Sequence, residues 1–241
     1  MSTDRIETKY FYAVEDQPTA ICGAYKGLKA MLDVKAARKS ELFNTVTHAV
    51  GSVVAVAGLV VLVVVASLQG DPWKIVSFSI YGATLVLLYI FSSLYHGLSG
   101  RAKKVFRYFD HTAIFLLIAG TYTPFTLVTL RGAWGWSILG TVWGLAVIGL
   151  VVDFFYHHKK RLLPILVYVL MGWLIIFACA PLLRALPMTG FFWLLFGGIL
   201  YTGGIIFYAL DKKLWPAHGI WHLFVLGGSV CHYVTVLVYI A

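Results

Sequence analysis

Long runs without a charged residue divide most of the chain into seven apolar segments. Each run is at or above the roughly 20 residues that cross the hydrocarbon core of a bilayer as a helix. The pattern therefore predicts an all-α membrane protein, a seven-transmembrane helix bundle with short loops between antiparallel neighbours. The seven runs are residues 42–70, 75–100, 111–130, 132–152, 162–183, 185–210 and 214–241.

The chain before the first run has a different character. Residues 1–40 form a mixed-charge tail, and residues 41–241 form the predicted transmembrane domain. Between Ala20 and Lys39 the tail alternates apolar and basic residues, which favours a short amphipathic helix at the membrane interface. A solvated tail without such a helix is the alternative interpretation.

Composition and charge support the membrane assignment. The chain is 60% hydrophobic and 12% charged, whereas about a quarter of the residues of a soluble domain are charged. When the seven spans are made to alternate, every Lys and Arg except Lys74, Arg131 and Arg184 falls on the side of the N-terminal tail. The positive-inside rule then predicts a cytoplasmic N-terminus and an outside C-terminus. We therefore expect a multi-pass protein of the plasma membrane, the inner membrane of a bacterium.

The net charge of +9 does not indicate a nucleic-acid partner. The basic residues lie in short loops next to the spans, where they attract anionic lipid headgroups. Membrane lipids are therefore the expected partners, and no nucleic acid is expected.

Four polar residues share one depth in this topology. His96 lies at the inner end of the second predicted span, and Asp110 lies at the inner start of the third. His218 and His222 lie at the inner start of the seventh. Ionisable residues inside a membrane are expensive and usually mark a functional site. The topology thus predicts a polar site at the cytoplasmic end of the bundle.

The spacing of these residues indicates a metal. His218 and His222 are four residues apart, so both imidazoles project from one helix face. Together with His96 they give three nitrogen ligands and leave a fourth position open, which is the pattern of a catalytic zinc. Asp110 is either a fourth ligand or a base that holds the zinc's water. Ser92, one turn before His96, is a candidate donor to a ligand or an oxyanion, and a closed structural zinc is the alternative.

Other polar residues are expected around this site. Asn44 and His48 are four residues apart at the inner start of the first span, where they can reach the rim of the site or cap the helix. His232 lies ten residues beyond His222, about 15 Å along a helix. It is therefore too far to share the metal, and we expect it to line a cavity inside the bundle. His111 neighbours Asp110 and is expected to point elsewhere.

Four separated segments resemble one known family, the hemolysin III branch of the progestin and adipoQ receptor family. The resemblance runs from about residue 41 to the C-terminus and leaves the tail uncovered. The segments are ELFNTVTHAVG at residues 41–51, SSLYH at 92–96, FDHTAIFLLIAGTYTP at 109–124 and HGIWHLFVLGGSVCH at 218–232.

This resemblance implies a seven-helix protein with its N-terminus inside and a zinc site in the inner leaflet. By motif position the zinc ligands fall on His96, His218 and His222, with Asp110 near the water of the metal and Ser92 beside it. The wider superfamily includes alkaline ceramidases and is proposed to contain metal-dependent lipid hydrolases. The short tail argues against a hormone receptor.

The expected function is zinc binding in membrane lipid homeostasis, by zinc-dependent hydrolysis of a lipid amide or ester. The expected partner within the bundle is an acyl lipid or a fatty acid. Two alternatives stay open. One is a lipid sensor or regulator in which zinc is structural. The other is a cytolytic protein, which is disfavoured because a chain this apolar has no soluble secreted state.

Overall fold

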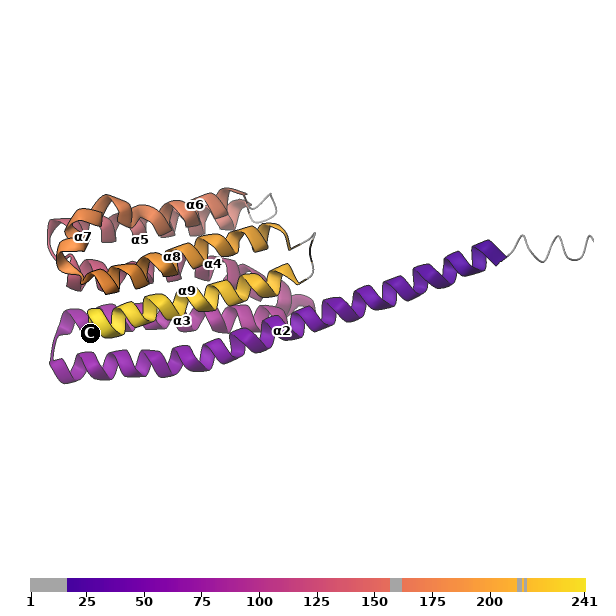
Figure 1. Ribbon diagram of the computed structural model, residues 1–241, viewed down its shortest axis with the longest axis horizontal. Coiled ribbons are helices and arrows are strands. Elements are labelled where there is room, and N and C mark those ends of the chain that lie inside the picture. The colour runs from indigo at the N-terminus through magenta and orange to yellow at the C-terminus, as the bar shows by residue number, and fades with distance from the viewer. Residues whose placement is uncertain (1–16, 157–161, 212–213, 215) are drawn as a thin grey trace, which may run out of the picture. The chain divides into compact units, whose positions relative to one another are not determined.

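The computed structural model describes residues 17–156, 162–211, 214 and 216–241, and every regular element in this part of the chain is helical. Figure 1 shows the order of the helices along the chain. Their bounds are α2 (Gln17–Gln69), α3 (Pro72–Gly97), α4 (Gly100–Pro124), η1 (Phe125–Thr129), α5 (Ala133–Tyr156), α6 (Leu162–Trp173), η2 (Leu174–Ala178), α7 (Cys179–Ala185), α8 (Met188–Ala209) and α9 (Ala217–Tyr239).

The seven predicted spans are confirmed. Seven helical segments of the described residues are long and apolar enough to cross a membrane, and each contains most of one charge-free run. The third span combines α4 with η1, and the fifth combines α6, η2 and α7. The spans are Lys35–Gln69, Pro72–Gly97, Gly100–Thr129, Ala133–Phe155, Leu162–Ala185, Met188–Ala209 and Ala217–Tyr239.

The chain divides into two compact units, Met1–Glu41 and Leu42–Ala241. Helix α2 continues through this boundary, so residues 17–40 form its first part rather than a separate short helix. The placement of this segment at the membrane interface stays a prediction, and residues 1–16 lie outside the described residues. In the second unit the helices lie side by side in one bundle (Figure 1).

Among the helix pairs of the described residues, α3 with α4 and α8 with α9 pack along the greatest length of backbone. Small residues allow transmembrane helices to approach closely. At Gly120 of α4, a Cβ atom would overlap the side chain of Thr84 on α3. At Gly228 of α9, a Cβ atom would lie 2.8 Å from the ring of Tyr201 on α8. These two helix pairs form the frame that carries the polar residues.

Two spans change their winding at neighbouring positions. Helix α4 ends at Pro124, and the chain continues as the π-helical turn η1. In the fifth span, the 3₁₀ turn η2 follows α6. The hydroxyl of Tyr122 donates to the carbonyl of Gly172 and accepts from the amide of Ile175, both at 2.9 Å. This hydroxyl therefore satisfies backbone groups that the break in the fifth span frees, as a membrane interior requires.

Replacing Gly120 with alanine should destabilise the bundle, because the new methyl group forces α3 and α4 apart at Thr84. Overpacking of this kind costs about 1–3 kcal/mol, measurable as a lower apparent Tm in detergent. Gly140→Ala is the matched control, since nothing lies within 4 Å of its added Cβ. Equal melting temperatures for the two variants would contradict the close approach at Gly120.

An odd number of spans places the termini on opposite sides, and the charge distribution predicts which side each takes. Alkaline phosphatase, which is active only outside the cytoplasm, should be active when fused after Ala241 and inactive when fused after Lys213. A green fluorescent protein fusion should give the reverse pattern. Phosphatase activity only in the Lys213 fusion would show that the N-terminus is outside.

Candidate metal centre

The candidate site forms where the end of α3 meets the start of α9. His96 lies one residue before the end of α3, and the chain then reverses through Gly100, whose φ of +63° glycine adopts without strain. His218 is the second residue of α9, and His222 follows one turn later on the same face. The antiparallel arrangement brings these helix ends to one level of the bundle.

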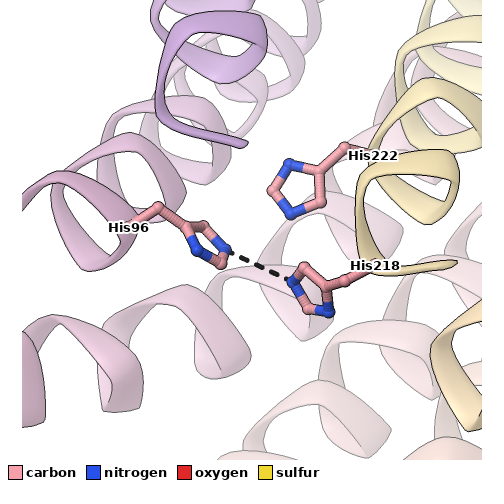
Figure 2. Close-up of side chains that lie close together, drawn as sticks. All are labelled: His96, His218 and His222. Atoms are coloured by element: carbon pink, nitrogen blue, oxygen red, sulfur yellow. Dashed lines mark hydrogen bonds between the residues drawn. The ribbon is translucent and has the colours of Figure 1, made fainter. Parts of the chain in front are cut away.

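The three histidines point toward one another (Figure 2). Nε2 of His96 lies 3.3 Å from Nε2 of His218. One candidate ligand atom from each ring can be chosen so that all three lie within 4.8 Å of one another. His96 and His222 are buried, and the side chain of His218 is 24% exposed. This cluster could hold a metal ion.

The separation of the two Nε2 atoms fits a tetrahedral metal. Zinc binds imidazole nitrogen at about 2.0–2.1 Å, and two ligands of a regular tetrahedron then lie about 3.3–3.4 Å apart. The 3.3 Å between His96 and His218 matches this spacing. Imidazole donors suit zinc, copper, iron and nickel, so the residues present fit a divalent transition metal.

A cavity of about 60 Å³ opens beside the histidines. Both residues that the sequence analysis proposed for catalysis, Ser92 and Asp110, line it together with His218 and His222. A site of this size has room for a few water molecules, since each needs roughly 10–15 Å³. The structure therefore brings Asp110, Ser92 and two of the three clustered histidines around one small cavity.

The two residues predicted at the rim come from α2. The ring of His48 packs against that of His222 with centroids 3.8 Å apart, and it meets Tyr89 edge-on at 5.1 Å. Asn44 is buried beside Gly219, where its Oδ1 would lie 3.4 Å from an added Cβ. His48 also lines the 60 Å³ cavity. These contacts place both residues against the cluster, and that of His48 restricts the ring of His222.

His232 lies apart from the cluster. It lines two further cavities, of about 100 and 120 Å³, and its Nε2 is 3.1 Å from the carbonyl of Leu194. The larger cavity borders the 60 Å³ cavity, because both share Ile114, Leu117, Tyr201 and Trp221 as walls. An apolar space therefore adjoins the candidate metal site.

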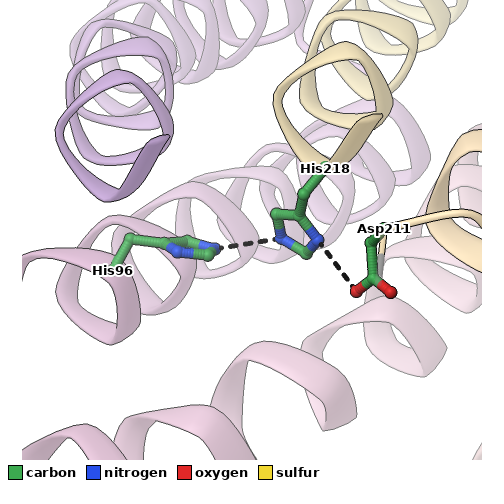
Figure 3. Close-up of polar contacts among 3 residues, drawn as sticks. All are labelled: His96, Asp211 and His218. Carbon is green, nitrogen blue, oxygen red and sulfur yellow. Dashed lines mark hydrogen bonds and ion pairs between the residues drawn. The ribbon is translucent and has the colours of Figure 1, made fainter. Parts of the chain in front are cut away.

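The structure adds residues that the sequence analysis did not select. Oδ2 of Asp211 lies 3.6 Å from Nδ1 of His218 (Figure 3). His111, expected to point elsewhere, also lines the 60 Å³ cavity, because the cavity extends along α4 past Asp110. A signal for Asp211 exists in the sequence, since it is the one acidic residue between the sixth and seventh apolar runs. Nothing comparable marks His111.

Similarity to known proteins decides the family. A profile described as "Haemolysin-III related" matches residues 36–233. This chain belongs to the haemolysin III-related family. It is 45% identical to "Hemolysin-3" of Bacillus cereus, over 84% of this chain and 92% of that protein. It is also 45% identical to the "Hemolysin-3 homolog" of Bacillus subtilis (strain 168), over 83% of this chain and 94% of that protein.

A more distant relative also matches most of this chain. The human "Monocyte to macrophage differentiation factor" is 29% identical over 82% of this chain and 83% of that protein. The resemblance inferred from the four sequence segments is therefore confirmed. With its seven spans and bacterial relatives, this haemolysin III-related chain is a multi-pass protein of the bacterial inner membrane.

We expect purified protein to retain a divalent transition metal, and His96→Ala, His218→Ala or His222→Ala to lose most of it. Each change removes one of three nitrogen ligands. Elemental analysis of detergent-purified protein measures the metal content. His232→Gln is the control, because His232 lines other cavities and the amide can still donate to Leu194. Metal loss in the control alone, or in no variant, would contradict this assignment.

Proposed function

We propose that this protein is a zinc-dependent hydrolase that cleaves the amide or ester bond of a membrane acyl lipid and so acts in membrane lipid homeostasis. His96, His218 and His222 would hold the zinc ion. The observation that carries the proposal is the shared cavity, which the Asp110 carboxyl and the Ser92 hydroxyl line beside the histidines. A metal site that only cross-links helices does not require a carboxyl group and an open space next to the ligands.

Zinc with three protein ligands and an open position activates water for attack and polarises a carbonyl group. The protein's own residues would manage the protons. The carboxylate of Asp110 accepts a proton as water oxygen bonds to the carbonyl carbon, and it returns this proton to the leaving nitrogen or oxygen when the C–N or C–O bond breaks. The hydroxyl of Ser92 donates to the oxygen that gains negative charge. The products are a fatty acid and an amine or an alcohol.

The surroundings of the site favour a lipid substrate. The apolar cavity of about 120 Å³ adjoins the cavity beside the histidines through shared walls that include Leu117 and Trp221. An acyl chain in the apolar cavity would bring its carbonyl group toward Asp110. A water-soluble substrate would leave this apolar space without a partner.

The test is fatty-acid release from a panel of ceramides, phospholipids and acylglycerols by detergent-purified protein. Asp110→Asn should lower the rate by a factor of about 10²–10⁴, the usual contribution of a general base, while metal content stays unchanged. Ser92→Ala should lower it by a smaller factor. Chelation should abolish release, and added zinc should restore it.

Asp71→Asn is the matched control for Asp110→Asn. Asp71 caps the start of α3, at the opposite end of this helix from His96, and asparagine is an equally good cap. Its rate should equal that of the wild type. Retained zinc with no hydrolysis of any lipid in the panel would overturn the enzymatic proposal and favour a lipid sensor with a structural zinc.

A further inference from the structure

We propose that Asp211 is a positioning residue for the candidate metal ligand His218, and that its carboxylate fixes which ring nitrogen faces the metal. This inference rests on the proposed zinc site. It adds to that site a carboxylate from the connection between α8 and α9, outside the three-histidine cluster and outside the cavity that Asp110 lines.

The two nitrogens of the His218 ring face different partners on opposite sides of the ring. Nδ1 of His218 faces Oδ2 of Asp211 at 3.6 Å, and Nε2 faces Nε2 of His96 at 3.3 Å. Figure 3 shows Asp211 and His96 on opposite sides of the His218 ring. Asp211 therefore contacts the ligand from the side away from the metal position.

A neutral imidazole carries one proton, on one of its two nitrogens. A carboxylate beside Nδ1 holds the proton there, which leaves the lone pair of Nε2 directed at the metal. Metal-bound histidines generally have such a partner on the other nitrogen, and it orients the ring and raises its basicity. At 3.6 Å the two groups are in ion-pair range, a few tenths of an ångström beyond hydrogen-bond length.

His218 needs this restraint more than the other two ligands do. His96 and His222 are buried, and the ring of His222 packs against His48. The side chain of His218 is 24% exposed, in the first turn of α9. Packing therefore restricts this ring less, and a polar contact can supply the orientation that packing does not.

The backbone places Asp211 for this role. It comes two residues after the end of α8, and its amide donates to the carbonyl of Tyr208 at 3.4 Å. Its negative charge is also attracted to two positive groups. One is a divalent cation held by neutral imidazoles, and the other is the positive end of the helix dipole at the N-terminus of α9. The carboxylate therefore favours metal binding through both orientation and charge.

The experiment measures zinc affinity of the full-length protein in detergent by competition with a chelator. Asp211→Ala should weaken zinc binding by about 10–100-fold, the usual effect of losing such a partner. Asp211→Asn should weaken it less, because the amide oxygen still accepts from Nδ1. Absorption bands of the cobalt-substituted protein should keep their positions, since no ligand is lost. Asp71→Asn is again the control and should bind zinc as the wild type does.

A second comparison shows whether Asp211 acts through His218. In a His218→Ala background, measured against a weaker chelator, Asp211→Ala should have little further effect, because coupled residues are not additive. An equal loss of affinity in both backgrounds, or unchanged affinity of Asp211→Ala in the otherwise native protein, overturns the inference. A wild-type protein that binds no zinc would instead overturn the proposed function.

Discussion

The structure depends on satisfying polar groups inside an apolar bundle, and this constraint is what brings α3 and α9 together. Among the helix pairs of the described residues, α3 packs most extensively with α4, and α8 with α9. Polar side chains, together with the shared apolar core, join the two pairs. The hydroxyl of Tyr89 donates to Ser229 at 2.7 Å, and His96 meets His218 at 3.3 Å. Because a polar group without a partner costs several kcal/mol in a membrane, these contacts fix which faces of α3 and α9 meet.

The same constraint organises the site. Ser229 also meets the hydroxyl of Tyr201 at 2.7 Å, so one short polar chain joins α3, α9 and α8 behind the histidines. Tyr201 in turn lines both the cavity beside the histidines and the larger cavity next to it. One of the residues that hold the helices together therefore also shapes both cavities.

The sequence predicts the spans and the level of the histidines well, because both follow from local composition and a regular helical rise. His96 lies near the end of one charge-free run and His218 near the start of another. Both therefore lie at an edge of the membrane, however the neighbouring helices pack. Asp211 and His111 could not be selected in this way. Their positions depend on how a connection folds back at the end of α8 and on how far a cavity extends along α4. Both depend on tertiary packing, which leaves no regular spacing of residues in the sequence from which to predict it.

Two adjoining cavities are the basis for proposing an amphiphilic substrate. The small cavity adds a carboxyl group, a hydroxyl group and imidazoles to a lining that also contains Leu88 and Val225, and the larger one beside it is lined mainly by aliphatic and aromatic side chains such as Ile118 and Val169. A purely polar molecule gains nothing from the larger space, and a hydrocarbon makes no use of the polar groups in the smaller. A molecule with a polar carbonyl group at the end of an apolar chain matches both, which is why we propose a membrane acyl lipid as the substrate.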